Sequence, residues 1–303
     1  MSDAQEPDHP GLPHTPGPSR VAPGLHLVAT PIGAARDITL RALDILTGAD
    51  VLAAEDTRSL RRLMEIHGIP VRGRPVLAYH DHNGAQVRPR LLAALAEGKS
   101  VAFAPEAGTP MVSDPGYQLA RAATEAGYSV VAAPGASAVL TALTVGGLPT
   151  DRFCFMGFPP QQGAARKRML AEAAAIPATL AFYESPKRIH RLLGEIGESL
   201  GTGRDCALCR ELTKRFEEVI RGTVADVTAA IEGRDLKGEI VLLVGRASDV
   251  EVGEADLDRA LHRALEGARV KDAATQVAEA LGLPRRQVYQ RALELSRAEE
   301  DDR

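Results

Sequence analysis

The sequence is poor in aromatic and sulfur-containing side chains. It has no Trp, and Phe, Trp and Tyr together make up 4% of its 303 residues. So few rings argue against a platform on which RNA bases stack, such as an RNA-recognition sheet. The three cysteines, Cys154, Cys206 and Cys209, lack the spacing of a disulfide framework, which favours a reducing cytoplasm.

Long apolar runs and an excess of positive charge are also missing. No apolar run approaches the roughly 20 residues that span a membrane, and the first residues lack a basic segment followed by an apolar core. We therefore expect neither a membrane span nor a signal peptide. The net charge of −4 is unlike that of most nucleic-acid-binding proteins, but a local basic surface would suffice to bind RNA.

Known nucleotide and zinc motifs are absent as well. Neither the Gly-x-Gly-x-x-Gly fingerprint nor a phosphate loop of the Gly-Lys-Ser type follows an apolar run, and no zinc-binding helix motif occurs. A cofactor held through its phosphates is therefore not expected. His80 and His82 would face the same way in an extended segment, so a metal is conceivable, but a third ligand is not evident.

The chain does contain an alternation of apolar run, polar loop and amphipathic segment, repeated about five times between residues 24 and 148. This order predicts a mainly parallel sheet with helices on both faces. The carboxyl ends of parallel strands share one edge, where ligands bind in open α/β sheets. Five polar loops should lie along that edge, namely residues 31–37, 55–58, 80–83, 105–116 and 134–138.

The loop at residues 105–116 is the most informative of the five. Its three prolines and two glycines cannot continue a strand or a helix, and it is longer than a simple βα connection needs. This favours a site where the backbone approaches a ligand, with a tight structural turn as the alternative. We expect Asp114 to cap the helix that begins near Gly116, and Glu106 to lie nearer the ligand.

The rest of the chain divides into three further parts. Residues 1–23 are rich in Pro, Gly, Ser and His, which predicts a disordered tail. Residues 149–246 alternate strands and helices, which predicts a smaller α/β domain with a mixed sheet. Residues 247–303 predict three helices, 257–266, 270–281 and 285–297, whose last turn resembles a helix-turn-helix. Such a bundle can read a nucleic acid or support a dimer.

Two patterns allow a structural as well as a functional interpretation. Cys206 and Cys209 resemble a redox or metal pair, but in a strand residues three apart point to opposite faces, so we expect buried packing. Arg58, Arg61 and Arg62 oppose the dipole of the helix that they begin. This unfavourable interaction would be offset if the arginines bound the phosphates of a nucleic acid. The alternative is that they only form a solvated face of the helix. Residues 166–168 and 187–188 invite the same two interpretations.

Ten segments, which include these loops and follow one another in a fixed order along the chain, resemble the ribosomal RNA small subunit methyltransferase I family. This family is a branch of the tetrapyrrole methylase superfamily. The resemblance covers about residues 24–244, and the helical end fits the extension of the same family. The segments are residues 28–33, 37–42, 54–58, 80–83, 107–110, 112–116, 134–138, 182–188, 209–214 and 238–241.

The resemblance implies two α/β domains with a cofactor cleft between them, plus the small helical bundle. It implies an enzyme that uses S-adenosyl-L-methionine, without a metal, to methylate the ribose 2′-hydroxyl of a cytidine in 16S rRNA. The substrate would be the assembled small ribosomal subunit, and the protein would be a cytoplasmic homodimer. Because this cofactor carries no phosphates, backbone groups of Gly/Pro loops can hold it.

Site residues follow from the resemblance and from the chemistry of the reaction. A carboxylate or histidine must take the proton of the hydroxyl, and the candidates are Asp37, Glu55, Asp56 and His80. The expected cofactor-binding residues are Pro31, Glu106, Ala107, Gly108, Thr109, Ser113, Asp114, Pro134, Gly135, Ser137, Ala138, Tyr183, Glu184 and Arg210. The expected RNA-binding residues are Arg36, Arg58, Arg61, Arg62, Lys187 and Arg188.

The chain departs from the family pattern at two places. Ala34, Ala35 and Arg36 replace a common Asn-Leu-Gly, and Pro105 and Glu106 replace a common Ser-Asp. The first change adds a cation on the expected substrate side, and the second lengthens an acid by one methylene. Two alternative functions remain at this point: a methyltransferase that acts on a tetrapyrrole, and a non-catalytic ribosome-assembly binder that retains the fold.

Overall fold

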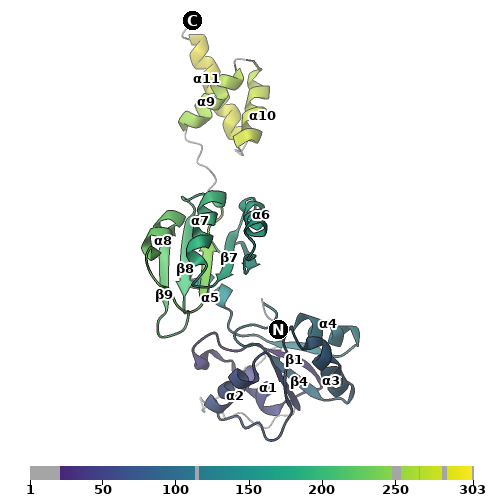
Figure 1. Ribbon diagram of the computed structural model, residues 1–303. Helices are drawn as coiled ribbons and strands as arrows, with labels where there is room; N and C mark the ends of the chain where they lie inside the picture. The colour runs from purple at the N-terminus through teal and green to yellow at the C-terminus, as the bar shows by residue number, and fades with distance from the viewer. Residues whose placement is uncertain (1–20, 113–115, 248–253, 266, 282–284, 302–303) are drawn as a thin grey trace, which may run out of the picture. The chain divides into compact units, whose positions relative to one another are not determined.

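The computed structural model describes residues 21–112, 116–247, 254–265, 267–281 and 285–301 (Figure 1). Most of the expected tail, residues 1–20, lies outside the described residues. The chain forms two compact units, Met1–Val244 and Gly245–Arg303. The first unit contains two sheets of five strands each, and the described residues of the second form three helices.

The first sheet is entirely parallel, as the alternation of strands and helices predicts. Its strand order is β3-β2-β4-β1-β5. Every residue of β1, β2 and β4 is buried, because helices cover both faces of a parallel sheet and leave no side for water. The strands are β1 (Gly24–Val28), β2 (Val51–Ala54), β3 (Val76–Ala78), β4 (Ser100–Ala104) and β5 (Val130–Ala133).

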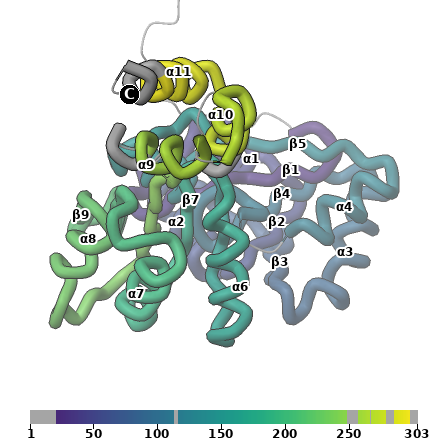
Figure 2. Tube along the Cα trace, turned by 90° about the horizontal axis from the view of Figure 1, so that it is seen from above, coloured from purple at the N-terminus to yellow at the C-terminus, as the bar shows by residue number. Residues whose placement is uncertain are grey.

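Two pairs of helices cover the two faces of this sheet. The short helix η1 (Ala35–Asp37) leads into α1 (Leu40–Gly48), which packs with α2 (Thr57–Ile66) on one face. Helices α3 (Gly84–Ala96) and α4 (Tyr117–Glu125) pack on the other face (Figure 2). The side chain of Thr39 accepts a hydrogen bond from the Ala42 amide, which caps α1.

The second sheet is mixed, as expected, in the order β6-β7-β10-β8-β9. Strands β6 and β7 are parallel, and the other neighbours are antiparallel. The register pairs Ile240 with both Glu184 and Arg210, so β7 and β8 end where β10 begins. The strands are β6 (Phe153–Gly157), β7 (Thr179–Glu184), β8 (Asp205–Arg210), β9 (Glu218–Thr223) and β10 (Ile240–Val244).

Helices cover this sheet unequally. Helices α6 (Gly163–Ala174), α7 (Ile189–Leu200) and α8 (Val224–Ile231) pack on one face. The other face is covered by α5 (Ala138–Gly146), which precedes the sheet in the chain and was expected to belong to the first domain. The guanidinium of Arg221 on β9 donates to the Val145 carbonyl, which satisfies one of the free carbonyls at the end of α5.

The two cysteines of β8 confirm the structural interpretation of their spacing. Cys206 belongs to the apolar core on the α7 side of the sheet, and Cys209 belongs to the core on the α5 side. Both thiols are buried, which raises the pKa of each to about 12. The thiols are therefore neutral at physiological pH and behave as small apolar groups.

A buried ion pair joins α6 to α7. Arg166, 3% exposed, forms a bidentate pair with Glu195 and also donates to the carbonyls of Pro160 and Gln161. Neither of the two interpretations given for residues 166–168, a phosphate contact or a solvated face, holds for Arg166, because its guanidinium is buried and paired inside the fold. The hydrogen bond from Arg166, with a second from Arg191, lowers the pKa of Glu195 to about 2.

The C-terminal unit is the expected three-helix bundle of α9 (Glu254–Leu265), α10 (Val270–Leu281) and α11 (Arg285–Asp301). Its apolar core includes Leu261, Val277 and Val288. A bidentate pair from Arg291 to Asp258 fastens α11 to α9, and it lowers the pKa of the aspartate. In the described part of the chain, no helix combines the length and the apolar composition needed to cross a bilayer.

Replacing Glu195 tests the buried ion pair. In Glu195→Gln the guanidinium of Arg166 loses its counter-charge inside the fold, so we expect unfolding to become easier by about 3 kcal/mol at pH 7. The low pKa of Glu195 stabilises the wild type above pH 4.5, and that stabilisation is lost as the pH falls towards 2. The difference in the free energy of unfolding between the wild type and Glu195→Gln, measured with urea, should therefore become smaller as the pH falls from 4.5 towards 2.

The matched control is Glu198→Gln on the same helix. The carboxylate of Glu198 is 68% exposed and lies 3.6 Å from the Lys167 ammonium. Its replacement should lower the free energy of unfolding by less than about 1 kcal/mol, both at pH 7 and near pH 2. Equal effects of the two variants would contradict a special role of the buried pair.

Candidate functional site

One cavity of about 400 Å³, here called the main cavity, lies where the loops of the two sheets meet. This volume suits a small organic ligand. The first sheet contributes the loops after β2 and β4 and the start of α5. The second sheet contributes the ends of β7 and β8 and the start of β10. The lining residues are Ile32, Glu55, Glu106, Ala107, Gly108, Thr109, Val112, Ser137, Ala138, Phe158, Tyr183, Glu184, Ser185, Pro186, Cys209, Leu212, Gly238, Glu239, Ile240 and Val241.

A second hollow of about 510 Å³, here called the α2 groove, lies between α2 and the loop that follows β1. Glu106 lines both hollows, so they adjoin at this residue. The groove is lined by Thr30, Pro31, Gly33, Ala35, Asp56, Arg58, Ser59, Leu60, Arg62, Leu63, Ile66, Pro105 and Glu106.

The loop after β4 is held in place by its own backbone. Thr30 and Gly108 exchange two backbone hydrogen bonds of 2.9 and 3.0 Å, and the hydroxyl of Thr109 donates to the Ala136 carbonyl. Gly108 has a φ of +81°, and a Cβ there would lie 3.3 Å from Ile32. Only glycine adopts this conformation without strain. The loop therefore crosses the ends of β1 and β5 in a fixed position.

The adjacent acids Glu55 and Asp56 have different environments. The carboxylate of Glu55 lines the main cavity and accepts the backbone amide of Glu106 at 3.1 Å. Asp56 is the N-cap of α2, and it accepts from the backbone amides of Arg58 and Ser59. The side-chain hydrogen bond from Arg58 lowers the pKa of Asp56, which makes that carboxylate a weaker base.

The second sheet supplies an aromatic wall and a buried acid. The ring of Tyr183 meets those of Phe155 and Phe158 edge to face, with centroids 4.9 and 5.4 Å apart. Glu184 is 3% exposed, and its Oε1 accepts from the Ser185 amide. Its Oε2 has no hydrogen-bond donor within the described residues, although Arg188 Nη2 forms an ion pair at 3.0 Å. A buried acceptor of this kind can receive a donor from a ligand.

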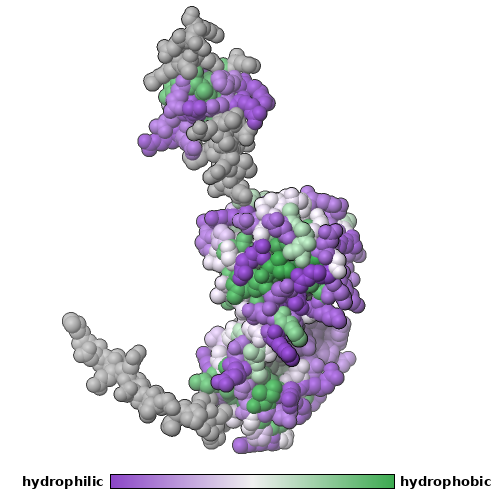
Figure 3. All heavy atoms as spheres, turned by 90° about the vertical axis from the view of Figure 1, so that its left-hand side faces the viewer, coloured by the Kyte–Doolittle hydropathy of each residue, from purple (hydrophilic) through white to green (hydrophobic). Residues whose placement is uncertain are grey.

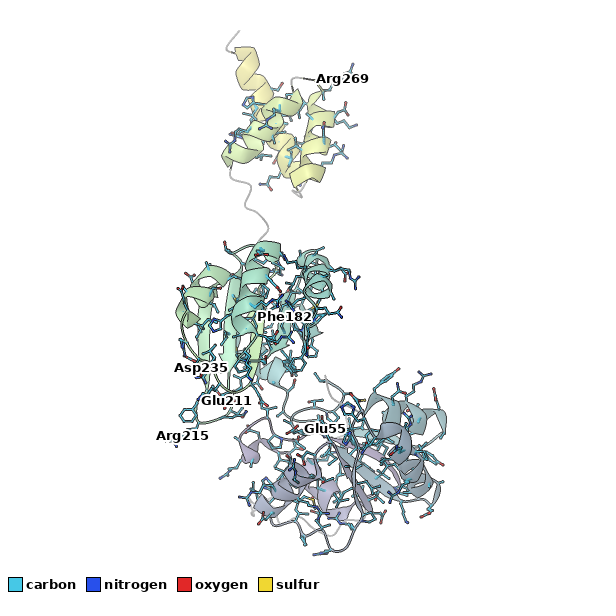
Figure 4. All side chains as sticks on the ribbon, viewed as in Figure 1. Glu55, Phe182, Glu211, Arg215, Asp235 and Arg269 are labelled. Atoms are coloured by element: carbon cyan, nitrogen blue, oxygen red, sulfur yellow. The ribbon has the colours of Figure 1, made fainter. Side chains whose placement is uncertain are left out.

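The loop after β8 is braced by charge. Glu211 lies beyond the ends of the strands of the second sheet (Figure 4). Lys214 pairs with Glu211 at 2.9 Å and with Glu239 at 2.7 Å, and the first contact lowers the pKa of Glu211. Glu211 and Thr213 have positive φ angles of 52° and 64°. Non-glycine residues rarely hold this conformation unless neighbouring contacts impose it. Gly238 belongs to the same brace, because a Cβ there would lie 2.3 Å from the Glu211 carboxyl group.

This loop also touches the first sheet's side of the cavity. The amide of Ala34 donates to the hydroxyl of Thr213 at 3.1 Å. A Cβ on Gly33 would lie 2.6 Å from that same hydroxyl and 2.6 Å from the side chain of Lys214. Glycine at this position therefore allows the loops after β1 and β8 to meet.

The structure brings most of the expected cofactor-binding residues together. Those that line the main cavity are Glu106, Ala107, Gly108, Thr109, Ser137, Ala138, Tyr183 and Glu184. Pro31 lines the α2 groove, and Arg210 pairs with Glu218. Pro134 and Gly135 lie beside the cavity but do not line it. Ser113 and Asp114, including the expected cap of α4, lie outside the described residues.

The four candidate proton acceptors lie in different places. Glu55 lines the main cavity, and Asp56 lines the α2 groove. Asp37 is exposed in η1 and lines neither hollow. His80 lies at the far edge of the first sheet, where it lines a separate hollow with Tyr79 and Arg88. Geometry therefore favours Glu55 over the other three.

The expected RNA-binding residues lie in three environments: the α2 groove, the exposed surface and a half-buried ion pair. Arg58 and Arg62 line the α2 groove, and Arg36 and Arg61 are exposed. Lys187 is exposed at the start of α7. Arg188 is half-buried, because it pairs with Glu184 and donates to the Pro159 carbonyl.

Several cavity residues were not expected from the sequence. Gly238–Val241 were among the resembling segments but were not assigned to the site. Phe158 follows β6, and the rule that ligands gather at the carboxyl ends of parallel strands could have indicated it. The others are Ile32, Val112, Ser185, Pro186, Cys209 and Leu212.

A metal site has no support from the described residues, because they contain no group of three or more His, Cys, Asp or Glu side chains that could hold an ion. The rings of His80 and His82 lie edge to face, with centroids 5.9 Å apart.

Comparison with known families covers nearly the whole chain. Residues 24–228 match the family of Tetrapyrrole (Corrin/Porphyrin) Methylases, and residues 251–296 match the RsmI C-terminal HTH domain. Among solved structures, cobalt precorrin-4 methyltransferase is similar, with a TM-score of 0.56 and 18% identity over 73% of this chain and 94% of that one. Uroporphyrin-III C-methyltransferase from Thermus thermophilus, complexed with S-adenosyl homocysteine, gives a TM-score of 0.51 at 18% identity, over 75% and 99% of the two chains.

Curated relatives are much closer in sequence than these structures. The ribosomal RNA small subunit methyltransferase I of Mesorhizobium japonicum is 46% identical over 90% of this chain and 92% of its own length. The protein of the same name from Escherichia coli O157:H7 is 42% identical over 89% of this chain and 94% of its own length. This chain therefore belongs to the ribosomal RNA small subunit methyltransferase I family, and its fold is that of the tetrapyrrole methylases.

Proposed function

We propose that this methyltransferase transfers the methyl group of S-adenosyl-L-methionine to the ribose 2′-hydroxyl of a cytidine in 16S rRNA. The proposed substrate is the assembled small ribosomal subunit in the cytoplasm. The observation that carries the proposal is that the main cavity adjoins the α2 groove, which Arg58 and Arg62 line, at Glu106. A small cofactor and a large substrate can then approach the same point from two sides. A homodimer, and a role of the C-terminal helices in RNA contact or dimer support, stay predictions.

The main cavity fits the proposed cofactor by several criteria. Its walls are backbone segments at Gly108 and Gly238 and apolar side chains such as Ile32 and Val241, which suit a ligand without phosphates. The buried carboxylate of Glu184 retains an oxygen that receives no hydrogen bond from the described residues. Glu184 also lines the main cavity, so its carboxylate would add an acidic group to the wall that meets the cofactor. A structural neighbour of the same fold, complexed with S-adenosyl homocysteine, supports the assignment.

The bound cofactor would supply an activated methyl group on a sulfonium, so the protein has mainly to position the hydroxyl and remove its proton. We assign to Glu55 the role of accepting the proton of the ribose 2′-hydroxyl. Its carboxylate lines the cavity and is oriented by the Glu106 amide at 3.1 Å. As the ribose oxygen gains the methyl group, its proton passes to the carboxylate of Glu55 and then to water. Ala107 and Gly108, which follow Glu106 in the lining of the cavity, have small side chains or none and leave room for the ribose.

Transfer of tritiated methyl groups tests the proposed function directly. The assay offers the labelled cofactor to isolated small subunits, to free 16S rRNA and to a tetrapyrrole precursor. We expect label in the rRNA of the subunit, at a cytidine ribose. Label in the tetrapyrrole alone would overturn the proposal. Absence of cofactor binding in isothermal titration would indicate a non-catalytic binder instead.

Replacing Glu55 by Gln should separate catalysis from binding. The amide keeps an acceptor for the Glu106 backbone N–H but cannot take a proton at neutral pH. We therefore expect kcat to fall about 100-fold or more, with the cofactor Kd within about threefold of the wild type. His80→Gln is the matched control, because His80 lines a different hollow and should leave kcat unchanged. A Glu55→Gln variant with wild-type kcat would contradict the assigned role.

Replacing Gly238 by Ala tests the brace around the cavity. The added methyl would overlap the Glu211 carboxyl group, and at a φ of +88° it would also strain the backbone. We expect the cofactor Kd, measured by titration calorimetry, to rise about tenfold. The control is Gly233→Ala, which has a similar φ of +69° but open space around the new methyl group. If both variants bind equally well, the brace does not shape the site.

A further inference from the structure

The α2 groove has a role that the transfer step itself does not require. We propose that it binds the single-stranded RNA segment adjacent to the target nucleotide, with Arg62 as a phosphate contact. This inference rests on the proposed function, because it takes the main cavity to be the place of methyl transfer.

The groove leads to the proposed reaction point. Pro105 and Glu106 form its inner end, and the Glu106 amide is 3.1 Å from the Glu55 carboxylate. An RNA strand that lies in the groove would therefore direct its next nucleotide towards the main cavity. Arg58 is paired with the Asp56 carboxylate at 3.2 Å, so of the two arginines that line the groove Arg62 is the one that suits a phosphate.

Spacing along α2 gives the groove its row of side chains. Arg58, Arg62 and Ile66 are four residues apart, which places them on one face of the helix. The row is about 12 Å long. Arg62 and Ile66 lie about one and two turns beyond Arg58, well past the N-cap Asp56, so the helix N-terminus is not the anion site. Asp56 already occupies that terminus.

The guanidinium of Arg62 is available for exchange. Its partner Glu65 lies 2.8 Å away, and both side chains are about 70% exposed. An exposed pair of this kind is worth little, because water and salt screen it. An RNA phosphate, which accepts two parallel hydrogen bonds from a guanidinium, can replace the carboxylate.

Apolar side chains complete the surface. Leu63 is half-buried and Ile66 is 51% exposed beside Arg62. Figure 3 shows hydrophobic patches between hydrophilic side chains on the face of the molecule that is on the left in Figure 1. Unpaired bases of single-stranded RNA rest on apolar groups and guanidinium planes, while their phosphates pair with arginine. This combination favours RNA over a ligand that is only charged or only apolar.

The test measures binding of the full chain to a 16S rRNA transcript at several salt concentrations between 50 and 200 mM. Arg62→Gln should reduce the slope of log K against log salt by about 0.7 to 1, because one phosphate contact is lost. Glu65→Gln should instead tighten binding about twofold, since it frees the guanidinium. The cofactor Kd should remain that of the wild type in both variants.

The matched controls are Arg121→Gln and Glu125→Gln. This pair is also exposed, at 2.7 Å, but it lies on α4 at the opposite face of the first sheet. Equal slopes for Arg62→Gln and Arg121→Gln, or for Arg62→Gln and the wild type, would overturn the proposal. An Arg62→Gln defect on small subunits that naked rRNA does not reproduce would indicate a ribosomal protein in the groove, and would overturn it as well.

Failure of this inference is distinguishable from failure of the proposed function. If no variant and no wild-type protein methylates rRNA, the proposed function fails, whereas the salt slopes still report on the groove. If methylation proceeds and the Arg62→Gln slope is normal, only the inference about the groove fails.

Discussion

The two backbone hydrogen bonds between Thr30 and Gly108 are the constraint on which the site depends. They bend the loop after β4 across the end of its neighbour β1, at a backbone conformation that only glycine holds without strain. Glu106 is thereby placed between the main cavity and the α2 groove, and its amide meets Glu55. The position of Glu106 beside Glu55 at the carboxyl end of the first sheet therefore depends on backbone hydrogen bonds and not on a side-chain contact.

Features that depend on local chemistry could be predicted from the sequence. β2 and β4 end directly before the loops expected at residues 55–58 and 105–116, because a polar loop ends a continuous apolar run. Thr223 forms the N-cap of α8, and Asp226, three residues on, completes a capping box, which is a local pattern of the sequence. The expected wall at Glu106–Thr109 also lines the cavity, because the carboxyl end of a parallel strand fixes where its loop begins.

Features that depend on contacts between distant segments could not be predicted in this way. Arg166 looks basic and exposed in the sequence, but Glu195, on the next helix, draws it into the interior. Phe158 has no motif around it, and its place in the cavity follows from its contact with Tyr183. The sequence does not rank the four candidate proton acceptors. His80 and Glu55 both follow a strand, and only the strand order shows that His80 follows the edge strand β3, away from the cavity that Glu55 lines.

The position of α5 has a consequence for how the chain folds during synthesis. The two apolar cores of the first sheet contain no residue of α5, so that lobe can close once β5 has left the ribosome. The core on the other side of the second sheet includes Val139, Ala142 and Leu143 of α5. A fragment that began at residue 149 would leave this face of β8 and β10 bare and prone to aggregate. The smallest autonomous second lobe therefore starts at α5, ahead of its own first strand.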